Sequence, residues 1–136
     1  MCDLPVFQRG SKDYRWIADL AVSTAILASR EQFYRGYTLL VLNQHATELF
    51  QLEPNIREQF MEDANRLAQA LDKTFKPLKM NYCLLGNVLP HLHWHLIPRR
   101  ETDPDPKWPV WGFPFPETQV SEDEFRQMAK DIRANL

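Results

Sequence analysis

Apolar and polar positions in the first third of the chain follow a pattern that predicts short strands. Residues 16–20 and residues 21–28 alternate with a rough period of two, which is typical of a strand with one face toward a core. Residues 37–42 form a continuous apolar run with β-branched members, which favours a buried central strand. The same pattern leaves a helix over residues 19–29 open as an alternative.

Helical periodicity is clearest over residues 54–75. Apolar residues recur there at intervals of three and four, and Pro54 suits the first helical position, so one amphipathic helix is predicted. The stripe consists of Ile56, Phe60, Ala64, Leu67, Ala68, Leu71 and Phe75. A second stripe follows the capping box Ser121-x-x-Glu124, which predicts a C-terminal helix within residues 121–136.

Two further strands are predicted between these helices. Residues 79–85 suit one of them, and residues 90–98, Pro-His-Leu-His-Trp-His-Leu-Ile-Pro, alternate strictly with a period of two. In a strand of that span, His91, His93 and His95 share one face and the apolar residues share the other. The two prolines suit the ends of the strand, because proline cannot donate to an interior ladder.

The composition changes after residue 100. Five prolines within 13 residues, interleaved with large aromatic residues, exclude a helix or an interior strand over residues 101–118. Exposed aromatics in this number would be a liability, so the segment is expected to lie across a protein surface, by plain packing or as a rigid cover over a site. The whole chain is expected to form one domain over residues 1–136, with its core in residues 15–100.

Overall composition narrows the classes of partner. The apolar share of 44% and charged share of 25% are ordinary for a globular protein, and a net charge of −2 gives no attraction to nucleic acid polymers. No apolar run approaches a membrane span and the N-terminus lacks a secretory leader pattern, so no membrane partner and a cytoplasmic location are expected. Cys2 and Cys83 are isolated thiols, so neither a disulfide framework nor a cysteine zinc site is expected.

The row of three histidines has several interpretations. It could be a solvated edge strand, although other polar residues would serve that purpose equally well. A His-x-His pair could hold a metal ion, but His91 and His95 would lie about 13 Å apart, too far to share one ion. The row could instead face an extended anionic substrate, with one imidazole as nucleophile or acid–base.

Residues 91–97 resemble the signature of the histidine triad (HIT) superfamily at every position. Residues 80–87 resemble the strand and turn that lead into the triad, and residues 36–45 resemble the family segment Gly-His-x-x-x-x-Pro-x-x-His. This resemblance implies an α+β fold, with an antiparallel sheet of about five strands, one long helix packed on it and a C-terminal helix. It also implies a homodimer whose sheets continue across the two-fold axis.

The resemblance implies hydrolysis or transfer at the α-phosphate of a nucleotide derivative, either a dinucleoside polyphosphate or a nucleoside phosphoramidate. By position His93 is the nucleophile, which forms a nucleotidyl-histidine while a backbone carbonyl accepts from its other ring nitrogen. His95 would contact the phosphate and the leaving group, and His91 would support the nucleophile. No bound cofactor is implied, although Mg²⁺ can accompany a polyphosphate substrate.

Three further residues are candidates for substrate binding. Asn81 and Asn87 supply amide donors beside the turn before the triad, and Ser29 aligns with the family residue that binds ribose hydroxyls. The alternative is that Asn81 only ends a strand and Asn87 only occupies a turn.

The chain also departs from the family pattern. Tyr37 and Leu42 replace a histidine and a proline, and Val88 lacks a hydroxyl that often contacts phosphate. His45 matches the last histidine of the upstream segment, where a structural role is expected. These departures keep open a nucleotide-binding protein with a weakened site, and the metal alternative keeps open a hydrolase or oxygenase that uses a His-x-His pair.

Overall fold

A computed structural model describes residues 13–136, so Cys2 lies outside the described part of the chain. The strands are β1 (Trp16–Asp19), β2 (Ser23–Leu27), β3 (Thr38–Leu42), β4 (Lys79–Cys83) and β5 (His93–Arg99). The helices are α1 (Pro54–Phe75) and α2 (Glu122–Arg133), together with the 3₁₀ turns η1 (Leu49–Gln51) and η2 (Val110–Gly112).

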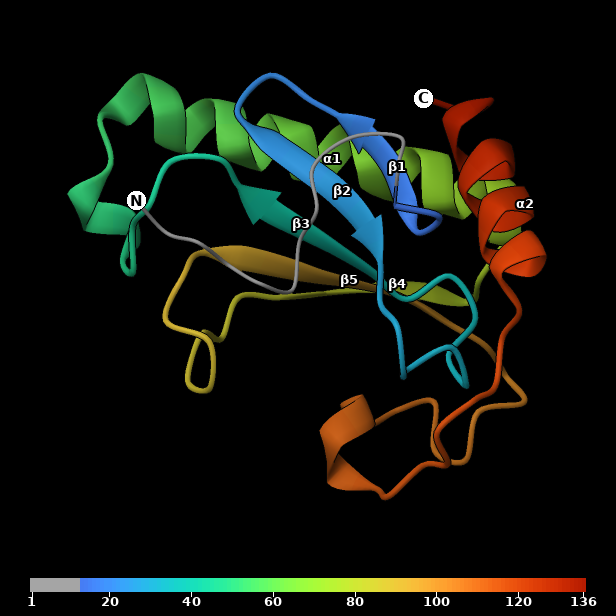
Figure 1. The fold of residues 1–136 in the computed structure, drawn as a ribbon. Helices are drawn as coiled ribbons and strands as arrows, with labels where there is room; N and C mark the ends of the chain where they lie inside the picture. The colour runs from blue at the N-terminus through green and yellow to red at the C-terminus, as the bar shows by residue number, and fades with distance from the viewer. Residues whose placement is uncertain (1–12) are drawn as a thin grey trace.

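The strands form one antiparallel sheet in the order β1-β2-β3-β5-β4 (Figure 1). The predicted α+β class and five-stranded antiparallel sheet are therefore confirmed, and β3 is central as its continuous apolar run indicated. The alternative helix over residues 19–29 is wrong, because residues 23–27 pair with β3 along their whole length. Each strand edge lies within a few residues of its predicted position, as is usual for element boundaries.

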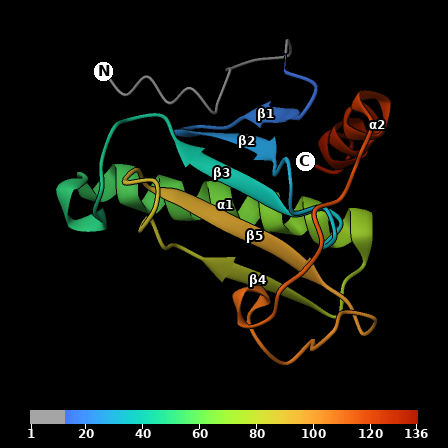
Figure 2. The same ribbon diagram turned by 60° about the horizontal axis from the view of Figure 1, so that its bottom comes forward.

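Helix α1 has the predicted bounds and lies along one face of the sheet (Figures 1 and 2). Its buried side chains contact the apolar face of the sheet, while α2 packs mainly against β1 and α1. Asp63 is also fully buried on α1, which the apolar stripe did not predict. Its carboxylate accepts from the Ser23 hydroxyl at 2.6 Å and from the Val22 backbone N–H at 2.9 Å, which ties the helix to the start of β2.

Strand β5 begins and ends later than predicted. It runs from His93 to Arg99, so His91 lies just before the strand and Pro98 lies inside it. Pairing with β3 stops at Thr38↔Leu96, whereas pairing with β4 continues to Lys79↔Arg99. Because Arg99 bonds toward β4, the backbone nitrogen of Pro98 points to the side that β3 no longer occupies, so its missing N–H costs no ladder bond.

The two faces of β5 serve different purposes. Trp94 and Leu96 lie on the helix side, and Trp94 packs against Phe60 of α1, so the apolar half of the repeat belongs to the core. His93 and His95 lie on the opposite face, where their partners in β3 are Val41 and Leu39. Strand β5 therefore has one face in the core beneath α1 and an opposite face that carries His93 and His95.

Residues 101–118 contain no regular element except the single turn η2, as their prolines predicted. The segment, orange in Figure 2, lies beside β4 and β5 on the side of the sheet away from α1. Val110 is buried against Tyr34, Tyr37 and Ile97, and Phe115 packs on Tyr34 with ring centroids 5.0 Å apart. Over residues 13–136, neither helix is long and apolar enough to cross a membrane.

Candidate active site

His93 presents one ring nitrogen to the backbone and the other to the open side of the sheet. Its Nδ1 lies 2.6 Å from the carbonyl oxygen of His91. A carbonyl can only accept a hydrogen bond, so Nδ1 carries the proton and the lone pair of the neutral ring is on Nε2. The acceptor is the backbone group type expected from the sequence. His93 therefore has the tautomer that a nucleophilic imidazole requires.

His91 is fixed from two directions at the entrance to β5. Its Nε2 lies 2.6 Å from the carbonyl oxygen of Leu42, so this nitrogen donates to the end of β3. Its Nδ1 lies 3.2 Å from Nδ1 of His45, so His45 supplies the proton of that contact. His45 thus reaches the triad, consistent with the supporting role that its position suggested. Both neighbours hold the carbonyl of His91 in place under His93.

His95 lies beside His93, with ring centroids 4.8 Å apart, and contacts the hydroxyl of Tyr37. The Tyr37 oxygen lies 2.7 Å from Nδ1 of His95. Burial raises the pKa of Tyr37, so the phenol keeps its proton, and donation to Nδ1 gives that proton an acceptor. The N–H of His95 is then on Nε2.

Burial also acts on His95 itself. Desolvation, together with a smaller effect of the neighbouring His93, lowers the pKa of His95 to about 4. His95 is therefore neutral at pH 7, and its Nε2–H can donate a hydrogen bond without carrying a full charge.

The Tyr37→Phe variant should release the tautomer of His95 while the pKa of His95 stays low. The hydroxyl that donates to Nδ1 is lost, so the Nε2–H form is no longer favoured over the Nδ1–H form, whereas the burial that lowers the pKa is mostly kept. NMR titration of ring-labelled histidine should show wild-type His95 as the Nε2–H tautomer down to pH 5, with its midpoint near 4. A wild-type midpoint near 6.5, or the Nδ1–H tautomer at pH 7, would contradict the assignment.

A pocket of about 200 Å³ opens beside His91 and His93. It is lined by Glu48, Leu49, Leu84, Leu85, Gly86, His91, Leu92 and His93. Its walls are mostly apolar, and the two imidazoles are the basic groups in it. His93 therefore borders a cavity whose wall also includes the turn before β5.

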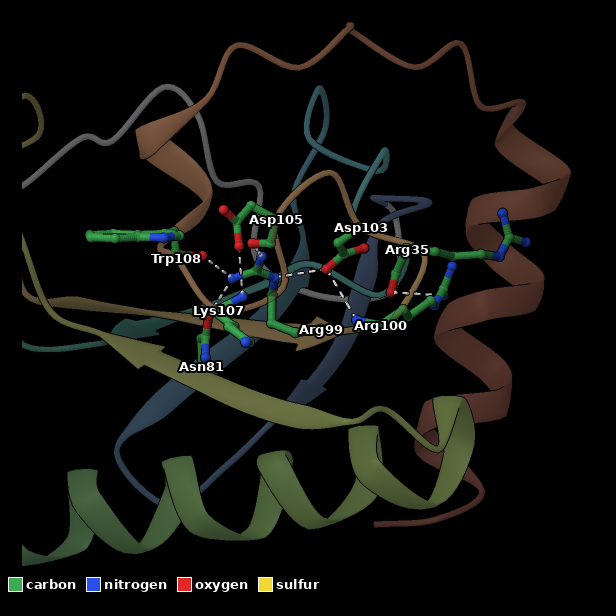
Figure 3. A network of polar contacts seen from close by, with 8 residues as sticks. All are labelled: Arg35, Asn81, Arg99, Arg100, Asp103, Asp105, Lys107 and Trp108. Atoms are coloured by element: carbon green, nitrogen blue, oxygen red, sulfur yellow. Dashed lines mark hydrogen bonds and ion pairs between the residues drawn. The ribbon is translucent and has the colours of Figure 1, made fainter.

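The predicted substrate residues are placed differently from one another. Asn81 lies on β4 next to β5, where its Oδ1 accepts from Nη1 of Arg99 at 2.9 Å, and it lines a pocket of about 390 Å³ with Cys83 and Trp108 (Figure 3). Asn87 is exposed in the turn before the triad, and Ser29 is exposed just after β2. Their roles in substrate binding stay predictions.

Arg99 organises the segment beyond the strand (Figure 3). Its buried guanidinium pairs with Asp103 at 2.8 Å and donates to the backbone carbonyls of Asp105 and Trp108 at 2.9 and 2.7 Å. The planar, five-donor group suits such a divergent set of acceptors. Arg99 has no local signal in the sequence, because a single arginine at the end of a strand has the same pattern whether its side chain is buried or exposed.

Trp111 is the second residue that the sequence analysis did not single out as part of the site. Its ring stands edge to face with His95, with centroids 5.3 Å apart and an interplanar angle of 89°. Cys83 faces His95 from β4 in the strand register and is half-buried. Tyr37, Cys83 and Trp111 therefore surround His95 from outside the triad, besides its neighbour His93.

Comparison with known proteins identifies what this arrangement is similar to. Residues 15–102 match the HIT domain family. A histidine triad protein from Sinorhizobium meliloti has a similar structure, with a TM-score of 0.80, 30% identity, and 98% of this chain and 99% of that one covered. A histidine triad protein from Bradyrhizobium japonicum gives a TM-score of 0.78 at 30% identity, with 88% of each chain covered.

A curated relative with a named activity is more distant in sequence. The adenosine 5′-monophosphoramidase HNT1 of Saccharomyces cerevisiae is 28% identical over 102 residues. The match covers 74% of this chain and 61% of the yeast protein, so the chain spans about three fifths of that relative's length.

Proposed function

Because this chain belongs to the histidine triad (HIT) family, whose domain its residues 15–102 match, we propose that it cleaves or transfers the nucleotidyl group of a nucleotide derivative through His93. The observation that carries the proposal is the tautomer of His93, whose Nδ1 donates to the His91 carbonyl and whose Nε2 is left with its lone pair. A site that only bound nucleotide would not require an imidazole held in this state.

The reaction proceeds in two displacements. Nε2 of His93 forms a bond to the α-phosphorus while the bond from phosphorus to the leaving group breaks. The ring gains positive charge in this step, and the His91 carbonyl stabilises it through the Nδ1–H. Water or another acceptor then attacks the phosphorus as its bond to Nε2 breaks, which returns the free imidazole. The proton that the acceptor loses balances the one that the departing amine or phosphate took up in the first displacement, with solvent as the carrier.

His95 acts on the departing side of the same reaction. Its ring lies next to that of His93, and we propose that its Nε2–H donates to the phosphoryl group that His93 attacks. A neutral donor can follow the oxygen or nitrogen atom on which charge develops as the bond breaks. Tyr37 is a positioning residue for this step, because it fixes the tautomer of His95 without contacting the substrate.

The substrate class follows from the relatives and from the apolar pocket beside His93. The yeast relative is named an adenosine monophosphoramidase, so an adenosine phosphoramidate is the first substrate to test, and a dinucleoside polyphosphate is the second. Asn81, Asn87 and Ser29 are proposed to bind phosphate and ribose. The nucleophile is part of the chain, so cleavage of the phosphoramidate requires no cofactor, whereas Mg²⁺ assists binding of the polyphosphate.

The test is AMP release from adenosine 5′-phosphoramidate and from diadenosine tetraphosphate, each in EDTA and with added Mg²⁺. Release from the phosphoramidate in EDTA is the expected result, and the ratio of the two kcat/KM values identifies the preferred leaving group. Cleavage that occurs only with metal, for both compounds, would contradict the histidine mechanism and favour metal-dependent hydrolysis. Nucleotide binding without release under any condition would make the chain a binding protein.

A further inference from the structure

Trp111 has no role in the displacement described above, yet it is placed against the triad. Its ring contacts His95 at 5.3 Å between centroids, and 45% of its surface is exposed. A tryptophan that served only as packing would be covered on most sides, as Val110 beside it is. The exposed part of the indole therefore leaves room for a further group next to His95.

The ring is held in this place by several independent contacts. Arg99 donates hydrogen bonds to the backbone carbonyls of Asp105 and Trp108. Val110, the first residue of the turn η2, is buried in the cluster that contains Ile97. The turn η2 closes with a hydrogen bond of 3.0 Å from the Gly112 N–H to the Pro109 carbonyl. Prolines on both sides restrict the backbone further. A rigid aromatic platform loses little conformational entropy when a ligand stacks on it.

The order of the rings defines which part of a substrate can reach Trp111. His93 and His95 are adjacent, and Trp111 contacts the ring of His95. The pocket of about 200 Å³ lies at the other end of the row, where His91 and not His95 is in its wall. A substrate whose phosphorus lies at His93 thus has one end in that pocket and the other over His95 toward Trp111.

We propose that Trp111 and His95 form a leaving-group subsite that takes an aromatic ring, such as a second nucleobase or an aryl-bearing amine. The inference rests on the proposed function, because it places the leaving group on the His95 side. Binding of an aromatic ring next to the indole and the imidazole is more favourable than binding of an aliphatic group of the same size. Aromatic pairs in edge-to-face or offset-stacked geometry contribute stabilisation beyond the buried area. The segment over residues 101–118 is then a specificity element attached to the triad by Arg99.

The test uses two AMP amidates that differ only in the arm of the amine. One is the amidate of 2-phenylethylamine and the other that of 2-cyclohexylethylamine, so size and basicity are matched and aromaticity is not. Wild type should prefer the phenyl compound in kcat/KM by roughly three- to tenfold, the range expected for one aromatic pair. Trp111→Ala should reduce this ratio to near one, and Trp111→Phe should keep most of it.

Trp108→Ala is the matched control on the same segment. Trp108 is 61% exposed, and its contact with Arg99 is made by the backbone carbonyl, which the substitution retains. The ratio should therefore follow Trp111 and not Trp108. An equal fall in both variants, or a Trp111→Ala variant that slows both amidates equally and keeps the ratio, would overturn the subsite.

Adenosine 5′-phosphoramidate separates this inference from the proposed function. Its leaving group is ammonia, which cannot reach Trp111. If wild type releases AMP from it but shows no preference between the two arms, the subsite is wrong and the enzyme assignment stands. If wild type releases AMP neither from the three amidates nor from diadenosine tetraphosphate, the proposed function itself fails.

Discussion

Replacement of His93 by alanine should lower kcat for AMP release by about 10³-fold or more, because the bond to the α-phosphorus has no other nitrogen to form on. Nε2 of His93 is the ring nitrogen whose lone pair the backbone leaves available. The neighbouring Nε2 of His95 carries a proton in the assigned tautomer and cannot replace it. Steady-state AMP release from adenosine 5′-phosphoramidate measures the effect.

The covalent intermediate gives this prediction a second readout. Wild type quenched at alkaline pH during turnover should carry AMP on the peptide that contains His93, as mass spectrometry detects, and the alanine variant should carry none. Thermal unfolding of the variant checks that the fold is intact. Turnover within tenfold of wild type, or an adduct on another residue, would reject His93 as the nucleophile.

Replacement of Arg99 by methionine should lower the free energy of unfolding by roughly 3–5 kcal/mol, since it leaves the buried carboxylate of Asp103 without its partner. The two side chains are only 2% and 6% exposed, and the guanidinium also satisfies Asn81 and two backbone carbonyls. Its stacking over Tyr34, with 5.3 Å from Cζ to the ring centroid, is lost as well.

Urea unfolding of two comparison variants separates charge burial from side-chain volume. Arg100→Met removes a neighbouring, partly buried arginine with one long bond of 3.3 Å to the Arg35 carbonyl, and it should cost less than about 1 kcal/mol. The double variant Arg99→Met with Asp103→Leu should recover part of the loss, because neither charge then remains buried alone. Equal losses for Arg99→Met and Arg100→Met would contradict the assigned role of the pair.

Periodicity was sufficient for the elements that bury one continuous face. Helix α1 has its predicted bounds because its apolar stripe spans the whole helix and Pro54 marks its start. The strand around the triad was placed less well. Its alternation begins at His91, but pairing begins at His93 with β3 and at His95 with β4, and only the pairing with β4 runs through Pro98. A local pattern does not record which neighbouring strand each residue bonds.

Local sequence patterns predicted less of the site than of the fold. Alternation predicted His91, His93 and His95 on one face of a strand. The structure brings His93 and His95 together within β5, whereas His91 lies before the start of the strand. The bond between Tyr37 and His95 joins residues 58 positions apart, and the contact with Trp111 depends on where Arg99 holds a segment without regular structure. No spacing rule connects such residues. The sequence therefore showed that Tyr37 replaces the family histidine, but it did not show that Tyr37 contacts His95.

The length of strand β3 sets the distance between two groups that contact the first and last histidines of the triad. The hydroxyl of Tyr37, just before this strand, fixes His95, and the carbonyl of Leu42, its last residue, fixes His91. Tyr37 and Leu42 are five positions apart and His91 and His95 are four positions apart, so the two contacts fit because both segments follow one antiparallel register. Exchange of one apolar side chain for another leaves that length unchanged, whereas a one-residue insertion or deletion would disconnect one end and invert the faces beyond it. Strand β3 should therefore tolerate exchanges among apolar residues better than it tolerates a change in its length.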